Sequence, residues 1–405
     1  MAAELYHYSA LRGRRLHLGV CGSVAAYKSV SLMRLLQKAG VSVNVTLTEA
    51  AAHFITPLTF EALGAEYVFT RMFGQDDGQS FAHLIPGQCA HAYMVAPCSA
   101  DALARIANGF ASEILCAQVL AFDGPVVLAP AMNPRMWNNR ATQDNLGTLK
   151  SRGIFILEPN EGQVACGDTG QGKLADVDQM ALEAAKALIS HDMQGKQVLL
   201  TLGPTQELWD GVRIWTNLSS GLMGASLAQA AYLRGATVHA VAGPGVPELP
   251  QGVIRHSVRS AVEMFSVAEK LWPDVDFGIF TAAVADFYPE PHQGKFKKRS
   301  SADGMSIRFL PNPDILATLG AKAKANQKIL AFAAETDNIE EQSRQKLVRK
   351  KAHLLAGNLV GKPDSGFAVA TNQMFVCDQT GREEHWPCLS KADVAWRLLD
   401  WLLTL

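Results

Sequence analysis

Two short motifs in the first half combine residue types that could hold a small molecule. Gly22-Ser23 offers backbone N–H groups and a hydroxyl, which suit a phosphate bound at a helix N-terminus. Asn133 follows Pro130 and precedes Pro134, and its amide on this stiff loop suits a carboxylate or carbonyl. An ordinary tight turn and a proline-flanked turn with a capping Asn would explain the same residues. Both possibilities stay open for each motif.

Two basic clusters lie in the second half. The first, in segment 295–299, comprises Lys295, Lys297, Lys298 and Arg299. In the second, Lys346 and Lys350 lie four residues apart on one face of a helix expected over 340–351. Solvated charged faces would explain both clusters. Their occurrence together with Asp286 and a strand expected at 332–336 favours triphosphate binding, because bound phosphates need cations to neutralise them.

The elements that must position these residues follow an α/β pattern. Segments beginning at Arg14 and Lys196, about 180 residues apart, each read as strand, glycine-bearing turn, helix and strand, the pattern of a parallel βαβ unit. Further buried strands are predicted at 92–96, 125–129, 154–157, 277–281, 329–333 and 374–377. We therefore expect two doubly wound, Rossmann-like α/β domains with mainly parallel sheets. The boundary at 191–195 gives domains 1–190 and 191–405.

Composition narrows the classes of function. The chain has 405 residues, 48% apolar and 19% charged, which predicts a compact globular protein. A net charge of -1 argues against a nucleic-acid or membrane-surface binder attracted by bulk charge. Seven cysteines without a CxxC pair fit a reducing compartment, and no apolar run is long enough to span a bilayer. We expect a cytoplasmic protein.

Four motifs of the first half together resemble the flavin-dependent cysteine decarboxylase family. They are residues 22–28, 97–101, 130–137 and 165–173, the last resembling the flap of the phosphopantothenoylcysteine decarboxylases. The resemblance implies a flavodoxin-like domain that binds FMN through Gly22, Ser23, Thr48, Ser99 and Ala100. It also implies that His83 is the base, that Asn133 orients the substrate carboxylate and that Cys166 donates a proton.

Two of these residues also have plainer explanations. His83 could be a surface histidine, and Cys166 could be an inert small residue, although its glycine-rich surroundings favour a lid. The chain departs from the family where segment 84–86 replaces the usual Ile-Glu-Leu and where Lys173 replaces the commoner Arg.

The second half resembles phosphopantothenate–cysteine ligase, a ribokinase-like or Rossmann-like domain. The matching motifs are residues 203–205, 212–224, 282–287, 295–298, 312–315 and 332–336. The resemblance implies that Lys295 stabilises charge in the first step and that Arg213 and Asn217 hold the activated intermediate. It implies CTP contacts from Ala282, Asp286, Lys295, Pro313, Asp314, Ile315, Leu316, Phe332, Lys346 and Lys350, with Mg2+ between the phosphates and its protein ligands unknown. Leu218, Leu222 and Pro311 stand where relatives usually carry His, Lys and Lys.

Together the resemblances imply a bifunctional enzyme of coenzyme A biosynthesis. The ligase would use CTP to join cysteine to 4'-phosphopantothenate through an acyl-cytidylate. The decarboxylase would convert the product, phosphopantothenoylcysteine, to 4'-phosphopantetheine, with FMN creating the electron sink that a simple aliphatic carboxylate lacks. Relatives form trimers through the flavin half and dimers through the ligase half, so a homo-oligomer without nucleic-acid or membrane partners is expected.

Two other classes remain to be compared with this one. A non-catalytic flavoprotein that regulates or binds other proteins would share the first-half motifs, but the presence of Asn133 and Cys166 argues against it. A nicotinamide oxidoreductase would need GxGxxG at a first turn, which neither half contains.

Overall fold

The computed structural model of the chain describes residues 5–73, 81–296, 305–335, 337–359 and 371–405. Among the residues of the sequence motifs, Lys297, Lys298, Arg299 and Thr336 lie outside these ranges. The chain divides into two compact units, Met1–Ser190 and His191–Leu405.

The first unit is built on a parallel sheet with the strand order β3-β2-β1-β4-β5-β6. Its strands are β1 (Arg15–Val20), β2 (Ser42–Leu47), β3 (Val68–Phe69), β4 (Ala92–Cys98), β5 (Val126–Pro130) and β6 (Phe155–Ile156). Without the two-residue edge strand β3, the order is the flavodoxin-like 2-1-3-4-5. This confirms the predicted fold class for the first half.

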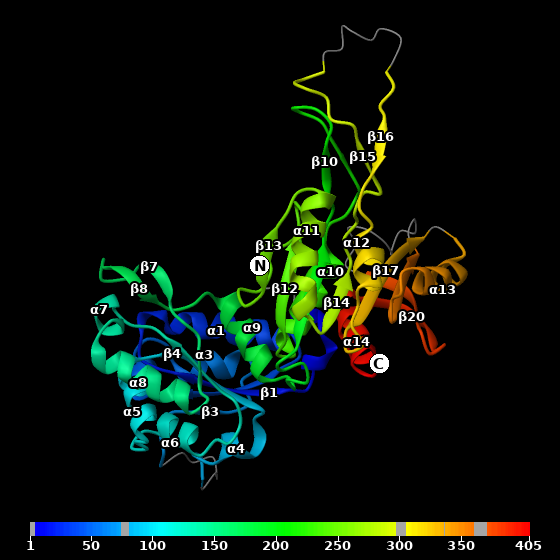
Figure 1. The fold of residues 1–405 in the computed structure, drawn as a ribbon. Helices are drawn as coiled ribbons and strands as arrows, with labels where there is room; N and C mark the ends of the chain where they lie inside the picture. The colour runs from blue at the N-terminus through cyan, green and yellow to red at the C-terminus, as the bar shows by residue number, and fades with distance from the viewer. Residues whose placement is uncertain (1–4, 74–80, 297–304, 336, 360–370) are drawn as a thin grey trace. The chain divides into compact units, whose positions relative to one another are not determined.

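Helices cover both faces of this sheet. They are η1 (Leu5–His7), η2 (Ser9–Leu11), η3 (Val24–Ala26), α1 (Tyr27–Lys38), α2 (Glu49–Ala52), α3 (Pro57–Ala62), α4 (Ile85–Cys89), α5 (Ala100–Asn108), α6 (Ile114–Leu120), α7 (Pro134–Trp137), α8 (Arg140–Ser151) and α9 (Val177–Ala187). Helices α1 and α9 pack together on one face, and α5 packs with α6 and α8 on the other (Figure 1). A small antiparallel hairpin, β7 (Asn160–Gln163) and β8 (Thr169–Lys173), precedes α9.

Local chemistry explains where these helices begin and end. The Ser99 side chain accepts a hydrogen bond from the backbone N–H of Ala102 and so begins α5, which ends at Gly109 with a φ of 72°. A glycine fits this left-handed position because it has no Cβ. Between these ends, α5 buries the apolar side chains Leu103 and Ile106 against the sheet. The helix is therefore held in register with the end of β4.

The second unit contains an eight-stranded sheet with the order β13-β12-β9-β14-β17-β18-β19-β20. Its strands are β9 (Gln197–Leu202), β12 (Thr237–Ala242), β13 (Ile254–Ser257), β14 (Phe277–Phe280), β17 (Lys328–Glu335), β18 (Leu354–Leu359), β19 (Thr371–Asp378) and β20 (Glu383–Ser390). All neighbours up to β18 are parallel in the Rossmann order, and β19 and β20 add an antiparallel edge. The prediction of a second, mainly parallel sheet is confirmed.

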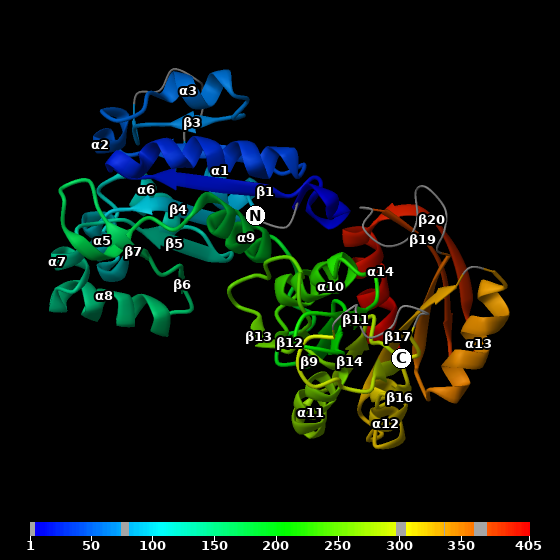
Figure 2. The same cartoon turned by 90° about the horizontal axis from the view of Figure 1, so that it is seen from above.

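The helices of the second unit again cover both faces of the sheet. They are α10 (Leu222–Leu233), α11 (Ala261–Leu271), η4 (Trp272–Asp274), α12 (Ile315–Ala321), α13 (Ile339–Arg349) and α14 (Lys391–Leu403). Helices α10 and α14 pack together on one face, whereas α11, α12 and α13 lie on the other (Figure 2). Two short antiparallel ribbons, β10 (Gln206–Leu208) with β11 (Ile214–Thr216) and β15 (Phe287–Pro289) with β16 (Phe309–Pro311), extend beyond the sheet (Figure 1).

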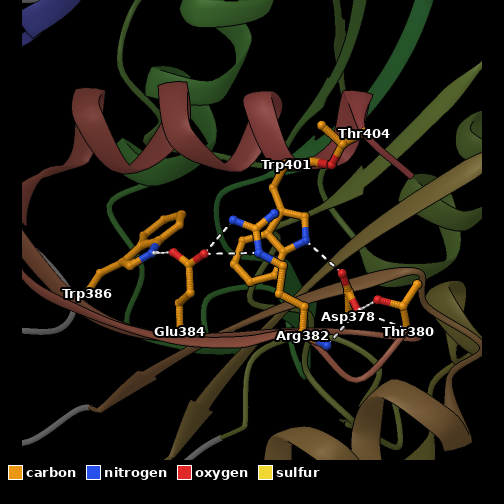
Figure 3. A network of polar contacts seen from close by, with 7 residues as sticks. All are labelled: Asp378, Thr380, Arg382, Glu384, Trp386, Trp401 and Thr404. Carbon is orange, nitrogen blue, oxygen red and sulfur yellow. Dashed lines mark hydrogen bonds and ion pairs between the residues drawn. The ribbon is translucent and has the colours of Figure 1, made fainter.

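A polar network joins the antiparallel edge to α14 (Figure 3). Asp378 accepts a hydrogen bond from Trp401 Nε1 at 2.8 Å, and the guanidinium of Arg382 lies 3.9 Å from the centroid of the Trp401 ring. Glu384 accepts from Arg382 and from Trp386 Nε1. Trp401 is 2% exposed, so its bond to Asp378 is buried, whereas Arg382 covers the Trp401 ring from the solvent side; together these contacts fasten the hairpin to the last helix. Separately, no helix in the described ranges has the length and apolar character needed to cross a membrane.

Candidate active sites

The residues predicted to hold FMN lie at the carboxyl ends of β2, β1 and β4, which are neighbours in the sheet. The side-chain oxygens of Thr48, Ser23 and Ser99 accept hydrogen bonds from backbone N–H groups two or three residues later, at 3.1, 3.2 and 3.2 Å. Each hydroxyl therefore caps a helical segment at the edge where α/β sheets bind ligands. Sequence periodicity predicts the strands, and strand order brings the three caps together.

These turns also approach one another closely. A Cβ added to Gly22 would lie 2.5 Å from the Cβ of Ala50, so the turn after β1 requires glycine beside the β2–α2 turn. The ends of the strands are joined as well, because Thr48 N–H donates to the Val20 carbonyl and Cys21 N–H donates to the Pro97 carbonyl. A close set of helix N-termini, hydroxyls and glycine fits the phosphate of a flavin mononucleotide.

A cavity of about 440 Å³ opens beside these turns. It brings together three residues that are far apart in the sequence, Ser23, Asn133 and Cys166. Lys28 and Lys173 also line it, giving the pocket two cations. Lys28 and Lys173 lie in the matched motifs, but neither was predicted to be a site residue, because a lysine alone does not indicate a binding site. Their charge suits an anionic substrate.

Asn133 is fixed in this cavity by both ends of its amide. The Oδ1 atom accepts from the Arg135 backbone N–H at 2.8 Å and caps α7. The Nδ2 atom donates to Asp168 Oδ2 at 2.7 Å and lies 3.1 Å from Cys166 Sγ. The hydrogen bond from Asn133, and then the charge of Arg135, lower the pKa of the Asp168 carboxyl below its usual value. The carboxylate next to the exposed Cys166 thiol is therefore ionised at neutral pH.

The hairpin β7–β8 brings Cys166 and Asp168 to Asn133, and we call it the flap. Its strand β8 docks on the Asn133 loop, where Met132 N–H donates to the Gly172 carbonyl at 3.0 Å. Gly172 has a φ of 152°, and an added Cβ would lie 2.3 Å from the Met132 carbonyl oxygen. The glycine-rich sequence thus permits close backbone contact with the loop. Sequence analysis predicted a lid here but not a paired hairpin.

His83 does not join this group. Within the described part of the chain, it is not among the residues lining the 440 Å³ cavity. It is half-buried on a turn closed by the Leu84 N–H to Phe81 carbonyl bond, and its ring meets that of Phe81 edge-on at 6.4 Å. The turn is held to α6, since Gln118 Nε2 donates to the Ala82 carbonyl at 3.1 Å. A single chain therefore leaves His83 apart from Asn133 and Cys166.

The second unit has a cavity of about 510 Å³ at the carboxyl ends of β9, β14 and β17. It is lined by the predicted nucleotide-contacting residues other than Lys295, namely Ala282, Asp286, Pro313, Asp314, Ile315, Leu316, Phe332, Lys346 and Lys350. The cavity lies beside the point where the strand order reverses between β9 and β14, the usual ligand position in such sheets. Arg349 also lines it. Its position three residues after Lys346 on α13 was the signal that could have identified it.

Both predicted phosphate-binding lysines are paired with carboxylates. Lys346 bonds Glu335 at the end of β17, and Lys350 bonds Asp314 at the start of α12. Burial would raise the pKa of Asp314, but the hydrogen bond from Lys350 and the cap of α12 outweigh it and lower the pKa. These ion pairs place the lysine ammonium groups on the cavity wall.

Three further predicted ligase residues lie beside this cavity or on the neighbouring ribbons. Asn217 Nδ2 donates to the Val284 carbonyl at 3.1 Å and so contacts the cavity-lining segment after β14. Arg213 bonds Asp210 at 2.6 Å, and the adjacent Phe296 N–H also donates to Asp210. Burial alone would raise the pKa of Asp210, but hydrogen bonds from the backbone N–H groups of Arg213, Val212 and Phe296, and then from the Arg213 guanidinium, lower it to about 2. Lys295, next to Phe296, is exposed and does not line the cavity.

Comparison with known proteins matches both units. Residues 4–190 match the model of the Flavoprotein family, and residues 193–405 match the DNA/pantothenate metabolism flavoprotein C-terminal domain. The coenzyme A biosynthesis bifunctional protein CoaBC of Vibrio vulnificus is 39% identical over 396 residues, covering 98% of each chain. That of Bacillus subtilis is 37% identical over 395 residues, covering 96% of this chain and 97% of the relative. A solved C-terminal domain of a CoaBC protein is 34% identical, covers 53% of this chain and 97% of its own, and superposes with a TM-score of 0.45.

The two family models and the CoaBC relatives confirm the resemblance that the motifs indicated. They also confirm the expectation of an enzyme of coenzyme A biosynthesis with decarboxylase and ligase activities and a flavoprotein half. The chain belongs to the family of the coenzyme A biosynthesis bifunctional proteins.

Proposed function

We propose that residues 191–405 ligate cysteine to 4'-phosphopantothenate with CTP, and that residues 1–190 then decarboxylate phosphopantothenoylcysteine with FMN. One observation supports this proposal above the others: Ser23, Asn133 and Cys166 line one cavity in the first unit, and the predicted CTP contacts other than Lys295 line one cavity in the second. The expected substrates are small and anionic, and both cavities present lysines to them.

In the first unit, Gly22, Ser23, Thr48, Ser99 and Ala100 would hold FMN at the carboxyl edge of the sheet. FMN held there would supply the two-electron redox chemistry that loss of CO2 from a simple aliphatic carboxylate needs. Asn133 would orient the substrate carboxylate through its Nδ2 donor, and Cys166 would protonate the carbon chain after decarboxylation. The flap would keep water out of the cavity around these groups.

His83 would remove a proton from the substrate. Because one chain keeps it out of the cavity that holds Asn133 and Cys166, we propose that it acts in the cavity of a second copy. A homo-oligomer formed through the first unit would supply that copy.

In the second unit, Lys346, Arg349 and Lys350 would face the triphosphate. The substrate carboxylate would attack the α-phosphate and release pyrophosphate; the cysteine amine would then attack the acyl carbon and release CMP. Asn217 and Arg213 would hold the activated intermediate, and Lys295 would neutralise charge in the first step. Across the described ranges, no group of three or more His, Cys, Asp or Glu side chains is placed to hold a metal ion. We therefore expect Mg2+ to arrive with the triphosphate.

A coupled assay tests the proposal. The full-length chain with FMN, 4'-phosphopantothenate, cysteine, CTP and Mg2+ is expected to release both pyrophosphate and CO2. Omitting CTP should abolish both, whereas supplied phosphopantothenoylcysteine should still yield CO2 without CTP. A yellow protein that releases no CO2 from phosphopantothenoylcysteine would refute the decarboxylase and favour a non-catalytic flavoprotein.

A further inference from the structure

The Asn133 amide is already bound to a carboxylate of its own chain. Its oxygen is used in capping α7, so Nδ2 is the donor available to a substrate carboxylate. That donor lies 2.7 Å from Asp168 Oδ2. A substrate carboxylate bound at Nδ2 would place a second negative charge against Asp168, and like charges at this distance repel strongly. The other N–H of Nδ2 points to Cys166 Sγ at 3.1 Å, so both N–H groups already have partners, and the two carboxylates compete for the position that Asp168 holds.

Arg135 provides a second partner for the Asp168 carboxylate once it leaves Asn133. Arg135 Nη2 lies 3.7 Å from Asp168 Oδ1, and the Arg135 side chain is 86% exposed, so its guanidinium is free to follow the carboxylate. Asp168 lies between β7 and β8 in the flap, and the contact of Gly172 with Met132 is separate from the Asn133–Asp168 bond. Asp168 can leave Asn133 while β8 stays docked.

We propose that Asp168 occupies the substrate-carboxylate position in the free enzyme and is displaced by the substrate toward Arg135. This inference rests on the proposed role of Asn133. It makes Asp168 a positioning and specificity residue: a ligand without a carboxylate cannot replace it on the Asn133 amide. Because decarboxylation removes that carboxylate, the product does not compete with Asp168, and Asp168 regains Asn133 after the reaction.

The test compares ligands with and without a carboxylate. In the full-length chain with FMN, Asp168→Ala is expected to lower the KM for phosphopantothenoylcysteine by about tenfold, because the competing charged hydrogen bond is lost. The inhibition constant of the product 4'-phosphopantetheine, which lacks the carboxylate, is expected to change by less than about twofold. Asp168→Asn keeps an acceptor without the charge and is expected to fall between Asp168→Ala and the wild type.

Glu161→Gln is the matched control, because it removes the same charge from β7 of the same hairpin and Glu161 is exposed. It is expected to leave both constants unchanged. Flavin absorbance in each variant verifies that the first unit is folded. A higher KM in Asp168→Ala, or equal shifts for substrate and product, would overturn the displacement.

The role of Asn133 is tested separately with Asn133→Ala. If Asn133→Ala keeps the wild-type KM, the proposed function of Asn133 fails. If Asn133→Ala raises the KM while Asp168→Ala leaves it unchanged, only the displacement by Asp168 is refuted.

Discussion

At the scale of single residues, the first unit contains a histidine unrelated to its chemistry. His17 is fully buried in β1, where Nε2 bonds Thr46 Oγ1 at 2.7 Å and the ring packs against Phe69 and Tyr93. Burial lowers the pKa of His17 to about 3, so the ring is neutral in the folded protein at pH 7. An unfolded chain would protonate it near its ordinary value of 6.5.

This difference predicts a loss of stability in mild acid. Between pH 6.5 and 3 the unfolded state binds the extra proton, so stability falls as the pH falls, by at most about 1.4 kcal/mol per pH unit from this group. His17→Phe is expected to be less stable than the wild type at pH 7, since it loses the Thr46 bond, but to lose less stability between pH 7 and 5. Urea unfolding, monitored by flavin release at each pH, measures how the free energy of unfolding of each protein changes with pH. Equal slopes for His17→Phe and the wild type would contradict the prediction.

A second prediction at this scale concerns the nucleotide cavity. Lys350→Gln removes an ammonium from the cavity wall and leaves Asp314 without its ion pair, so the KM for CTP is expected to rise by roughly tenfold. Decarboxylation of supplied phosphopantothenoylcysteine is expected to be unaffected. Lys322→Gln, which removes an ammonium that pairs with Glu269 away from the cavity, is the control. A similar rise in KM in the control would show an effect of overall charge instead of a local contact.

At the scale of elements, the flap depends on glycines that allow it to dock. Gly172→Ala would bring a Cβ to 2.3 Å from the Met132 carbonyl oxygen at a φ of 152°, so β8 must move away from the Asn133 loop. A displacement of about 1 Å at a catalytic group can lower the rate on the order of 100-fold, and we expect CO2 release to fall accordingly. Ligase activity is expected to persist.

Gly147→Ala is the control for this substitution. Gly147 lies in α8, and an added Cβ has no atom within 4 Å. It is expected to keep full decarboxylase activity and to gain up to about 1 kcal/mol of stability from improved helix propensity. Equal activity in Gly172→Ala and the wild type would show that docking of β8 is not required.

Most of the parallel strands could be predicted from sequence because they are short buried apolar runs, whereas the two-residue β3 and the mostly exposed β13 were not predicted. The runs at 125–129 and 329–333 correspond to β5 and β17, and the cap residue Ser99 follows β4 as expected. The flap could not be predicted as a hairpin, since β8 carries glycines instead of alternating apolar residues. Contacts such as Asp378 to Trp401, which depend on tertiary packing, left no periodic signal.

At the scale of the whole molecule, strand order explains how most of the candidate site residues come together. Ser23, Asn133 and Cys166 are more than 30 residues apart in sequence. Ser23 and Asn133 follow parallel strands that end at one edge, and the flap adds Cys166 to the same cavity. His83 could not be placed this way. A motif identifies the residue type that a reaction needs, but it carries no information on which copy of the chain supplies it.

The position of His83 leads to a prediction about mixed oligomers. His83→Ala and Asn133→Ala are each expected to abolish CO2 release. If His83 acts in the cavity of another copy, oligomers containing both variants combine an intact His83 from one chain with an intact Asn133 from the other. Random mixing would restore roughly a quarter of all sites, and about a third of the sites in an isolated trimer that contains both variants. The measurement is CO2 release from mixed oligomers isolated with two different affinity tags after co-expression.

A second pair of variants provides the control. Asn133 and Cys166 line the same cavity of one chain, so no mixture of Asn133→Ala with Cys166→Ser rebuilds an intact cavity. That mixture is expected to form no 4'-phosphopantetheine, whereas the mixture with His83→Ala is expected to form it. No recovery with His83→Ala would rule out the contribution from a second copy, and the base would then have to be sought among residues of the same cavity.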